Sequence, residues 1–181
     1  KRAIVGRDMR PHSIPLFEAM SAGLTLQGVD VVDIGLCSTP MLYYATGKLE
    51  GDAGVMITAS HNPGEWNGAK MTRESAIPIS GATGIRDIER IINENSYDEA
   101  AGTRGTISQH DIGAEYNGHV RMRANLGRPI RLAVDMANGM GIVEARTLEG
   151  IIEMDAIFDE LDGTFPNHEA NPLKADTYET L

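Results

Sequence analysis

The sequence predicts an α/β protein with a three-layer first domain, built on a mixed, largely parallel sheet, and the start of a second, similar α/β domain. Two observations support this fold class. Short apolar or β-branched runs alternate with stretches of helical periodicity through the first half of the chain. After a polar stretch at residues 93–109, the same alternation begins again. We therefore expect domains at residues 1–105 and 106–181.

The expected first domain alternates strands with helices, which is typical of βαβ units on a parallel sheet. The runs that predict strands lie at residues 2–5, 29–34 and 53–57. The apolar spacings that predict helices lie at residues 13–27, 40–49 and 80–93. Asn67 and Gly68 form a tight-turn signal, so Lys70 is expected on a strand that returns beside residues 53–57.

The expected second domain is incomplete and follows the polar stretch, which we interpret as a linker. The expected elements are helices at 111–124 and from the Gly-rich turn 138–141 to Leu148, and strands at 130–135 and near 157–158. Residues 162–173 contain two prolines and two asparagines and are expected to be irregular.

Composition restricts the class of protein. The formal net charge of −10 argues against a nucleic-acid partner, but a few cations in a cleft could still bind a small anion. No apolar run approaches the roughly 20 residues of a bilayer span, so no membrane partner is expected. The single cysteine, Cys37, excludes an internal disulfide and suits a reducing compartment. A cytoplasmic location is therefore predicted.

The most informative stretch is residues 55–70. An apolar strand signal ends there in Ser60-His61-Asn-Pro-Gly, which can continue neither a strand nor a helix. A hydroxyl and an imidazole are thus predicted on a turn at the carboxyl end of a strand, where open α/β sheets place their chemistry. Lys70 adds a positive charge close by. These three side chains are the candidate catalytic residues.

Five segments of the chain together resemble the α-D-phosphohexomutases, and most closely their phosphomannomutase/phosphoglucomutase group. The first is the stretch just described, Thr58-Ala-Ser-His-Asn-Pro63 with Trp66-Asn-Gly-Ala-Lys70. The others are Gly6-Arg-Asp-x-Arg10, Thr39-Pro-x-Leu-Tyr43, Val134-Asp-x-x-Asn-Gly139, and Asp162-Gly-x-Phe-Pro-Asn-His168 followed by Asn171-Pro172. The resemblance covers the family's first domain, without its amino-terminal strand, and the first part of the second domain.

The resemblance implies an isomerase of carbohydrate metabolism that moves a phosphoryl group between the 1- and 6-positions of glucose or mannose phosphates. Ser60 would be a phosphoserine, His61 a general acid/base and Lys70 a ligand of phosphoryl oxygens. Arg10 would either bind the substrate phosphate or brace the Ser60 loop, with Asp8 as its structural partner. The expected ligands are a phosphohexose and a hexose bisphosphate.

The resemblance also implies Mg²⁺, held by an oxygen of phosphorylated Ser60 and by aspartates expected beyond Leu181. The 181-residue chain alone is therefore expected to be an inactive fragment. Two alternatives remain open: a phosphatase in which water takes the phosphoryl group from Ser60, and a non-catalytic domain that binds a phosphosugar. The sequence decides neither between mannose and glucose nor the oligomeric state.

Overall fold

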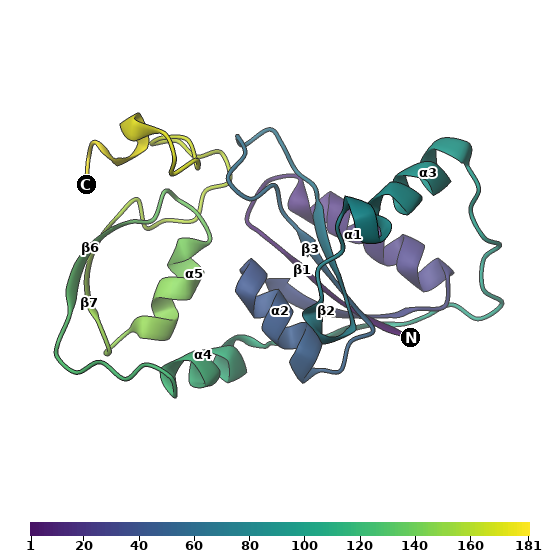
Figure 1. Ribbon diagram of the computed structural model, residues 1–181, viewed down its shortest axis with the longest axis horizontal. Coiled ribbons are helices and arrows are strands. Elements are labelled where there is room, and N and C mark those ends of the chain that lie inside the picture. The colour runs from purple at the N-terminus through teal and green to yellow at the C-terminus, as the bar shows by residue number, and fades with distance from the viewer.

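The computed structural model describes residues 1–181, apart from the side chain of Tyr178. It contains a five-stranded sheet with helices on both faces and a separate two-stranded sheet near the carboxyl end (Figure 1). The predicted α/β class is confirmed. We refer to residues 1–109, which hold the larger sheet, as the first part and to residues 110–181 as the second part.

The larger sheet has the strand order β4-β3-β1-β2-β5. Only the β3–β4 pairing is antiparallel, and it pairs Lys70 with Met56, so Lys70 lies on a returning strand as predicted. The tight turn predicted at Asn67 and Gly68 is wrong, because the chain turns at Gly64 and Glu65 instead. The strands are β1 (Arg2–Arg7), β2 (Asp30–Leu36), β3 (Ala53–Ile57), β4 (Ala69–Arg73) and β5 (Ile107–Gln109). Strand β5 lies inside the predicted linker and pairs with β2, so the first sheet extends past residue 105; the domain boundary itself stays a prediction.

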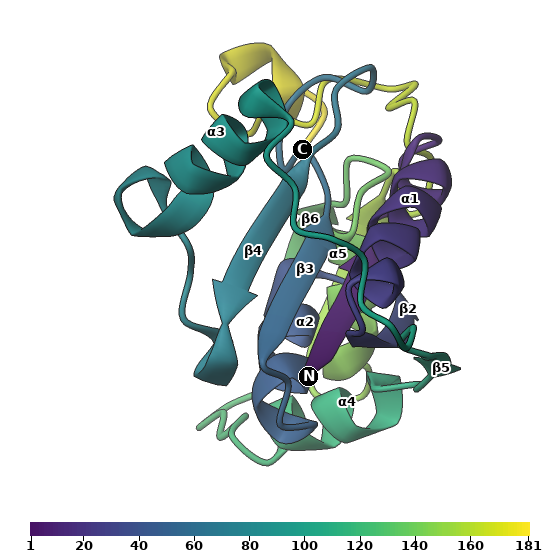
Figure 2. The ribbon, with the colours of Figure 1, turned by 90° about the vertical axis from the view of Figure 1, so that its right-hand side faces the viewer.

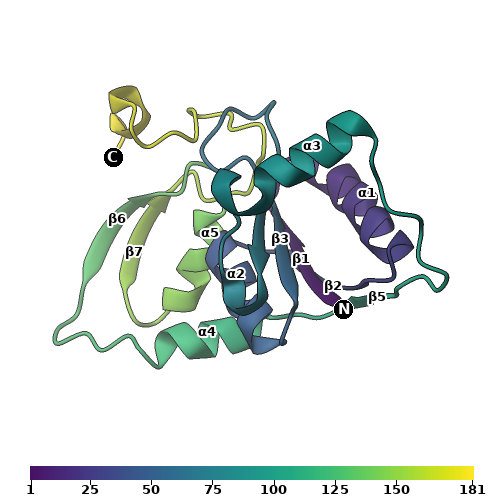
Figure 3. The ribbon, with the colours of Figure 1, turned by 45° about the vertical axis from the view of Figure 1, so that its right-hand side comes forward.

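Helices cover both faces of this sheet. Helix α1 (Ser13–Leu26) packs over Val5, Val31 and Val55 through side chains that include Phe17. Helix α2 (Thr39–Lys48) packs on the opposite face, where Leu42 joins Ile4 and Met56. Figure 3 shows α1 and α3 on one side of the sheet and α2 on the other. The alternation of side chains along each strand thus supplies two separate cores.

The predicted helix at residues 80–93 consists of two pieces. A π-helical turn (Gly81–Ile85) precedes helix α3 (Arg86–Glu94), and Gly84 within the turn has a φ of +146°. None of the described residues of α3 is buried. Figure 2 shows α3 near β4 and away from the centre of the sheet. A short 3-10 helix (Glu74–Ala76) links β4 to this segment.

The second part begins with helix α4 (Gly113–Arg121) and continues with β6 (Arg131–Asp135), α5 (Gly141–Ala145) and β7 (Glu153–Ile157). Strands β6 and β7 are parallel, so this unit is a small βαβ arrangement. The predicted strand near 157–158 in fact begins at Glu153. It ends before Phe158, whose φ of +52° is incompatible with an extended strand. Two 3-10 helices complete the part, at Arg146–Leu148 and Ala175–Tyr178.

The two parts are in close contact. Ile112 and Tyr116 of the second part are buried in the core cluster beneath α2. At the other end of the contact, a Cβ on Gly163 would lie 2.6 Å from the Cα of Arg10, so the two backbones meet there directly. Within the part of the chain that the structure describes, no helix has the length and apolarity needed to cross a membrane.

Candidate active site

Ser60 lies in the loop between β3 and β4, at the carboxyl end of β3. Its φ is +60°, a left-handed conformation that costs free energy for a residue with a Cβ. The conformation is held by hydrogen bonds on both sides of the residue. The Ser60 N–H donates to Thr58 Oγ1 at 3.0 Å, and the Ser60 carbonyl accepts from Arg10 Nη2 at 3.0 Å. Such strain is typical of functional sites.

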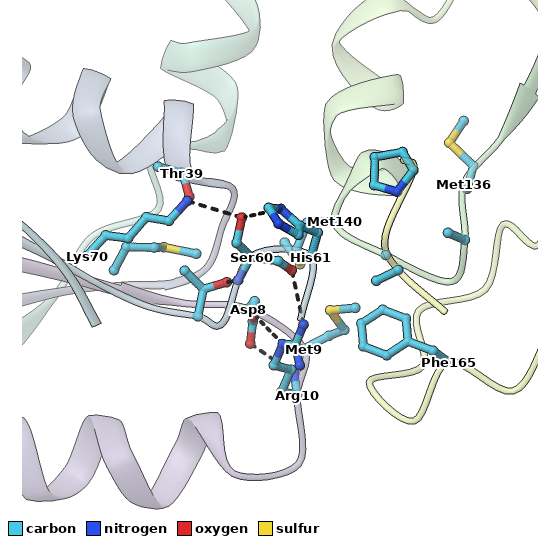
Figure 4. A pocket seen from close by; sticks show the side chains of 16 residues that line it. Asp8, Met9, Arg10, Thr39, Ser60, His61, Lys70, Met136, Met140 and Phe165 are labelled. Atoms are coloured by element: carbon cyan, nitrogen blue, oxygen red, sulfur yellow. Dashed lines mark hydrogen bonds and ion pairs between the residues drawn. The ribbon is translucent and has the colours of Figure 1, made fainter. Parts of the chain in front are cut away.

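The three predicted catalytic side chains meet at the Ser60 hydroxyl (Figure 4). Ser60 Oγ lies 3.4 Å from His61 Nδ1, and Lys70 Nζ donates to Ser60 Oγ at 3.4 Å. All three residues are exposed to solvent. The register of the β3–β4 hairpin places Lys70 beside the loop, because Lys70 pairs with Met56 near the end of β3. Sequence reasoning therefore identified groups that the fold does bring together.

Arg10 has a different environment, and its side chain is fully buried. Nε donates to Asp8 Oδ2 at 3.2 Å. The four remaining N–H groups of the guanidinium donate to backbone carbonyls of the Ser60 loop, at distances from 2.7 to 3.0 Å: those of Ser60, Asn62, Pro63 and Trp66. A guanidinium has five N–H donors, so none remains free for a substrate phosphate. This geometry favours the bracing role over the predicted substrate contact.

A second chain of hydrogen bonds ties the same loop to the start of α1. Asn67 Nδ2 donates to Ser13 Oγ at 2.9 Å, and Ser13 Oγ donates to Asp8 Oδ1 at 2.6 Å. Asp8 is only 5% exposed, and its carboxylate accepts from both Arg10 and Ser13. Asp8 is therefore the structural partner that the sequence predicted. The role of Ser13 was not predicted, since nothing in its local sequence indicates it.

A cavity of about 310 Å³ lies over the Ser60 hydroxyl, between the two parts. Polar side chains on the first-part wall include Asp8, Ser60, His61 and Lys70. The second-part wall is largely apolar and contains Met136, Met140, Phe165, Ala170 and Pro172. The volume of the cavity is at the lower end of the range for small-molecule sites.

Phe165 connects the two walls. The guanidinium carbon of Arg10 lies 5.0 Å from the centre of the Phe165 ring, within the range of a cation–π contact. The sequence had indicated an irregular segment here, and only the three-dimensional structure brings Phe165 to Arg10. The neighbouring Gly163 permits this approach, because a side chain there would collide with the backbone around Arg10.

Comparison with protein families gives a match over residues 1–99 to the model described as phosphoglucomutase/phosphomannomutase, alpha/beta/alpha domain I. This covers more than half of the chain. The chain belongs to the phosphoglucomutase/phosphomannomutase family. Its Ser60 loop, cavity and strand order can accordingly be compared with those of other members.

Among family members, a phosphomannomutase from Escherichia coli is 40% identical over 183 residues, covering 95% of this chain and 40% of the relative. A phosphoglucomutase from Neisseria gonorrhoeae is 37% identical over 182 residues, and the match covers 99% of this chain and 39% of the relative. The crystal structure of a phosphoglucomutase/phosphomannomutase family protein from Burkholderia thailandensis superposes with a TM-score of 0.89 at 30% identity, covering 99% of this chain and 40% of that one. The chain thus spans about 40% of the length of these relatives.

Among the residues that the structure describes, no three His, Cys, Asp or Glu side chains are grouped so that they could hold a metal ion. The group next to Ser60 Oγ is the ammonium of Lys70, and the nearby Asp8 carboxylate is already bound by Arg10 and Ser13. Mg²⁺ prefers near-octahedral oxygen coordination.

Proposed function

We propose that this chain is the phosphoserine-bearing part of a phosphohexomutase, which transfers a phosphoryl group reversibly between the 1- and 6-positions of glucose or mannose phosphates. The observation that carries the proposal is the meeting of three groups beside a cavity. The Ser60 hydroxyl lies on a strained loop, and both the His61 imidazole and the Lys70 ammonium lie 3.4 Å from its oxygen. The family match and the names of the relatives support the reaction class.

In the proposed reaction, the bond between phosphorus and Ser60 Oγ breaks as a sugar hydroxyl bonds to the same phosphorus, giving a hexose bisphosphate. His61 accepts the proton of the attacking hydroxyl, and the departing oxygen of the exposed Ser60 takes up a proton from solvent. Lys70 neutralises charge on the phosphoryl oxygens as a point charge. In the return step, the phosphoryl group at the other sugar position is transferred back to Ser60 Oγ. Transfer of this kind depends mainly on positioning and charge stabilisation.

Mg²⁺ belongs to this proposal only with ligands from outside these 181 residues. An oxygen of phosphorylated Ser60 would be its one contact within the chain. We accordingly propose that the 181-residue chain alone does not turn over glucose 1-phosphate. A coupled assay for glucose 6-phosphate measures this directly, and turnover by the purified chain would contradict it.

The mutase proposal can be tested in a chimera. The chain would replace the corresponding segment of the Escherichia coli phosphomannomutase, to which it aligns over 95% of its length. We expect an active chimera that carries phosphate on Ser60, as mapped by peptide mass spectrometry. Ser60→Ala should abolish both signals, whereas Ser80→Ala, at an exposed serine outside the cavity lining, should leave them intact.

Two further variants separate the proposed roles. His61→Ala should lower kcat by about 10²–10⁴, the usual effect of removing a general acid/base. Lys70→Ala should lower kcat and raise KM, because its charge would act on bound phosphate and on the transition state. Release of inorganic phosphate without isomerisation would favour the phosphatase alternative. Binding of the phosphosugar with neither reaction would favour the non-catalytic one.

A further inference from the structure

A carboxylate on α5 links the second part to the first part at the amino-terminal end of α2. Glu144 accepts hydrogen bonds from Ser38 Oγ, through Oε1, and from Tyr116 OH, through Oε2 at 3.1 Å. Ser38 and Glu144 are 106 positions apart in the sequence. One side chain of the second part therefore joins the N-cap of α2 to helix α4, and neither family motif nor local sequence pattern had singled it out.

The surroundings of Glu144 suit a persistent contact. Ser38 is 5% and Tyr116 is 7% exposed, so water competes little for either hydroxyl. Burial, and secondly the Glu144 charge, raise the pKa of Tyr116 to about 12, so its hydroxyl stays protonated and able to donate. Ser38 Oγ itself accepts from the N–H of Met41, which places the Glu144 carboxylate beside the amino-terminal end of α2. The helix dipole favours a negative charge there.

The position of this contact relates it to the cavity. Thr39 follows Ser38 directly and lines the cavity from the first part, while Met140 precedes α5 and lines it from the second part. The hydrogen bonds of Glu144 therefore connect the two segments that form opposite walls. The contact of Gly163 with the Arg10 backbone lies at a different place and is the competing means of holding the parts together.

We infer that Glu144 is a positioning residue, whose hydrogen bonds with Ser38 and Tyr116 fix α5 against the amino-terminal end of α2 and so set the separation of the cavity walls. The inference concerns the placement of one part relative to the other. It does not rest on the proposed function, and it can be measured in the 181-residue chain without substrate.

The test measures the distance between spin labels on Glu18→Cys in α1 and Ala156→Cys in β7, both exposed positions on regular elements. Cys37 is fully buried and would remain unlabelled, which intact mass verifies. Double electron–electron resonance should give one narrow distance distribution for the chain with native Glu144. Glu144→Ala should broaden it, and Ser38→Ala with Tyr116→Phe, which removes both donors but keeps the carboxylate, should broaden it similarly.

Glu89→Ala is the matched control, because Glu89 is an exposed glutamate on α3 and should leave the distribution narrow. Circular dichroism of each variant checks that the chain keeps its secondary structure. A distribution that stays narrow and unshifted in Glu144→Ala would overturn the inference, because the Gly163 contact would then suffice. A narrow and unshifted distribution in the Ser38/Tyr116 double variant would also overturn the inference, because that variant keeps Glu144 but removes both of its hydrogen-bond donors.

Discussion

His168 has a hydrogen-bond acceptor opposite each of its ring nitrogens. Nδ1 lies 2.8 Å from the carbonyl oxygen of Glu169, and Nε2 lies 3.0 Å from Asp135 Oδ2. A neutral imidazole has one N–H, whereas the imidazolium has two and can donate to both acceptors. The hydrogen bond to Glu169 chiefly, and the Asp135 carboxylate in addition, raise the pKa of His168 above its ordinary value of 6.5.

This raised pKa predicts how stability depends on pH. The folded state binds the proton more tightly than the unfolded state, so the His168 contribution is fully present below about pH 6.5 and is lost as pH rises through the raised pKa. We expect urea unfolding midpoints to fall over this window. His168→Gln should make the unfolding midpoint fall less with rising pH, whereas the control His12→Gln, at an exposed histidine, should leave the fall unchanged. Parallel curves for the native and His168→Gln chains would contradict the prediction.

Arg10 gives a second prediction at the same scale. Arg10→Ala would leave the buried Asp8 carboxylate without its cation and four loop carbonyls without donors. Breaking a buried ion pair in this way costs about 3–5 kcal/mol, measured as the free energy of unfolding in urea. The control is Arg90→Ala, whose exposed pair with Glu94 is worth only about 0.3–0.5 kcal/mol. Equal effects of the two variants would show that the bracing is not energetically important.

At the scale of elements, the approach of α2 to the sheet depends on a glycine in β3. A Cβ on Gly54 would lie 2.4 Å from Thr46 Oγ1 of α2 and 2.6 Å from Thr72 Oγ1 of β4. Both threonines are almost completely buried, so neither can move aside into solvent. Helix α2 therefore lies as close to the sheet as it does because β3 has no side chain at this position.

Gly54→Ala should consequently destabilise the first part by about 1–3 kcal/mol, the usual cost of overpacking a core. Gly47→Ala is the matched control on α2 itself, since no atom lies within 4 Å of the added Cβ. That change should instead stabilise the chain by about 0.5–1 kcal/mol, because alanine favours the helix over glycine. Thermal unfolding of both variants gives the comparison, and a neutral Gly54→Ala would mean that α2 can shift freely.

The elements also show what the sequence could and could not predict. The apolar run of β3 and the turn chemistry after it were sufficient to predict Ser60 at the end of a buried strand. Strand β5 escaped prediction because it has three exposed residues at a sheet edge and no hydrophobic alternation. The contacts of Glu144 escaped prediction because they join residues far apart in the sequence, and the sequence left the role of Arg10 open between bracing the loop and binding phosphate. A count of available N–H donors, which favours the bracing role of Arg10, requires coordinates.

At the scale of the whole molecule, burial is distributed unequally between the two parts. The central strand β1 has neighbours on both sides, and its Ile4 and Val5 are completely buried. In β6, by contrast, the first three residues are exposed and the last two half-buried. Apolar burial is the main source of stability, so the second part depends more on its contacts with the first part than on a core of its own.

This asymmetry predicts the order of hydrogen exchange. Amides of β1 and β3 should exchange slowest, near the rate set by global unfolding, and those of β6 and β7 should exchange faster through opening of the second part alone. Exchange followed by mass spectrometry on peptides from the two sheets distinguishes them. Equal protection of β1 and β6 would mean that the 181 residues unfold as one cooperative unit.

The four carbonyls that converge on Arg10 also give the Ser60 loop an electrical polarity. In a planar trans peptide unit the N–H points opposite to the C=O, and the described chain has no cis peptide bonds. The amide N–H groups of His61, Gly64 and Asn67 therefore point away from the guanidinium. A buried cation fifty positions earlier in the chain thereby fixes the orientation of the main-chain amides in this loop.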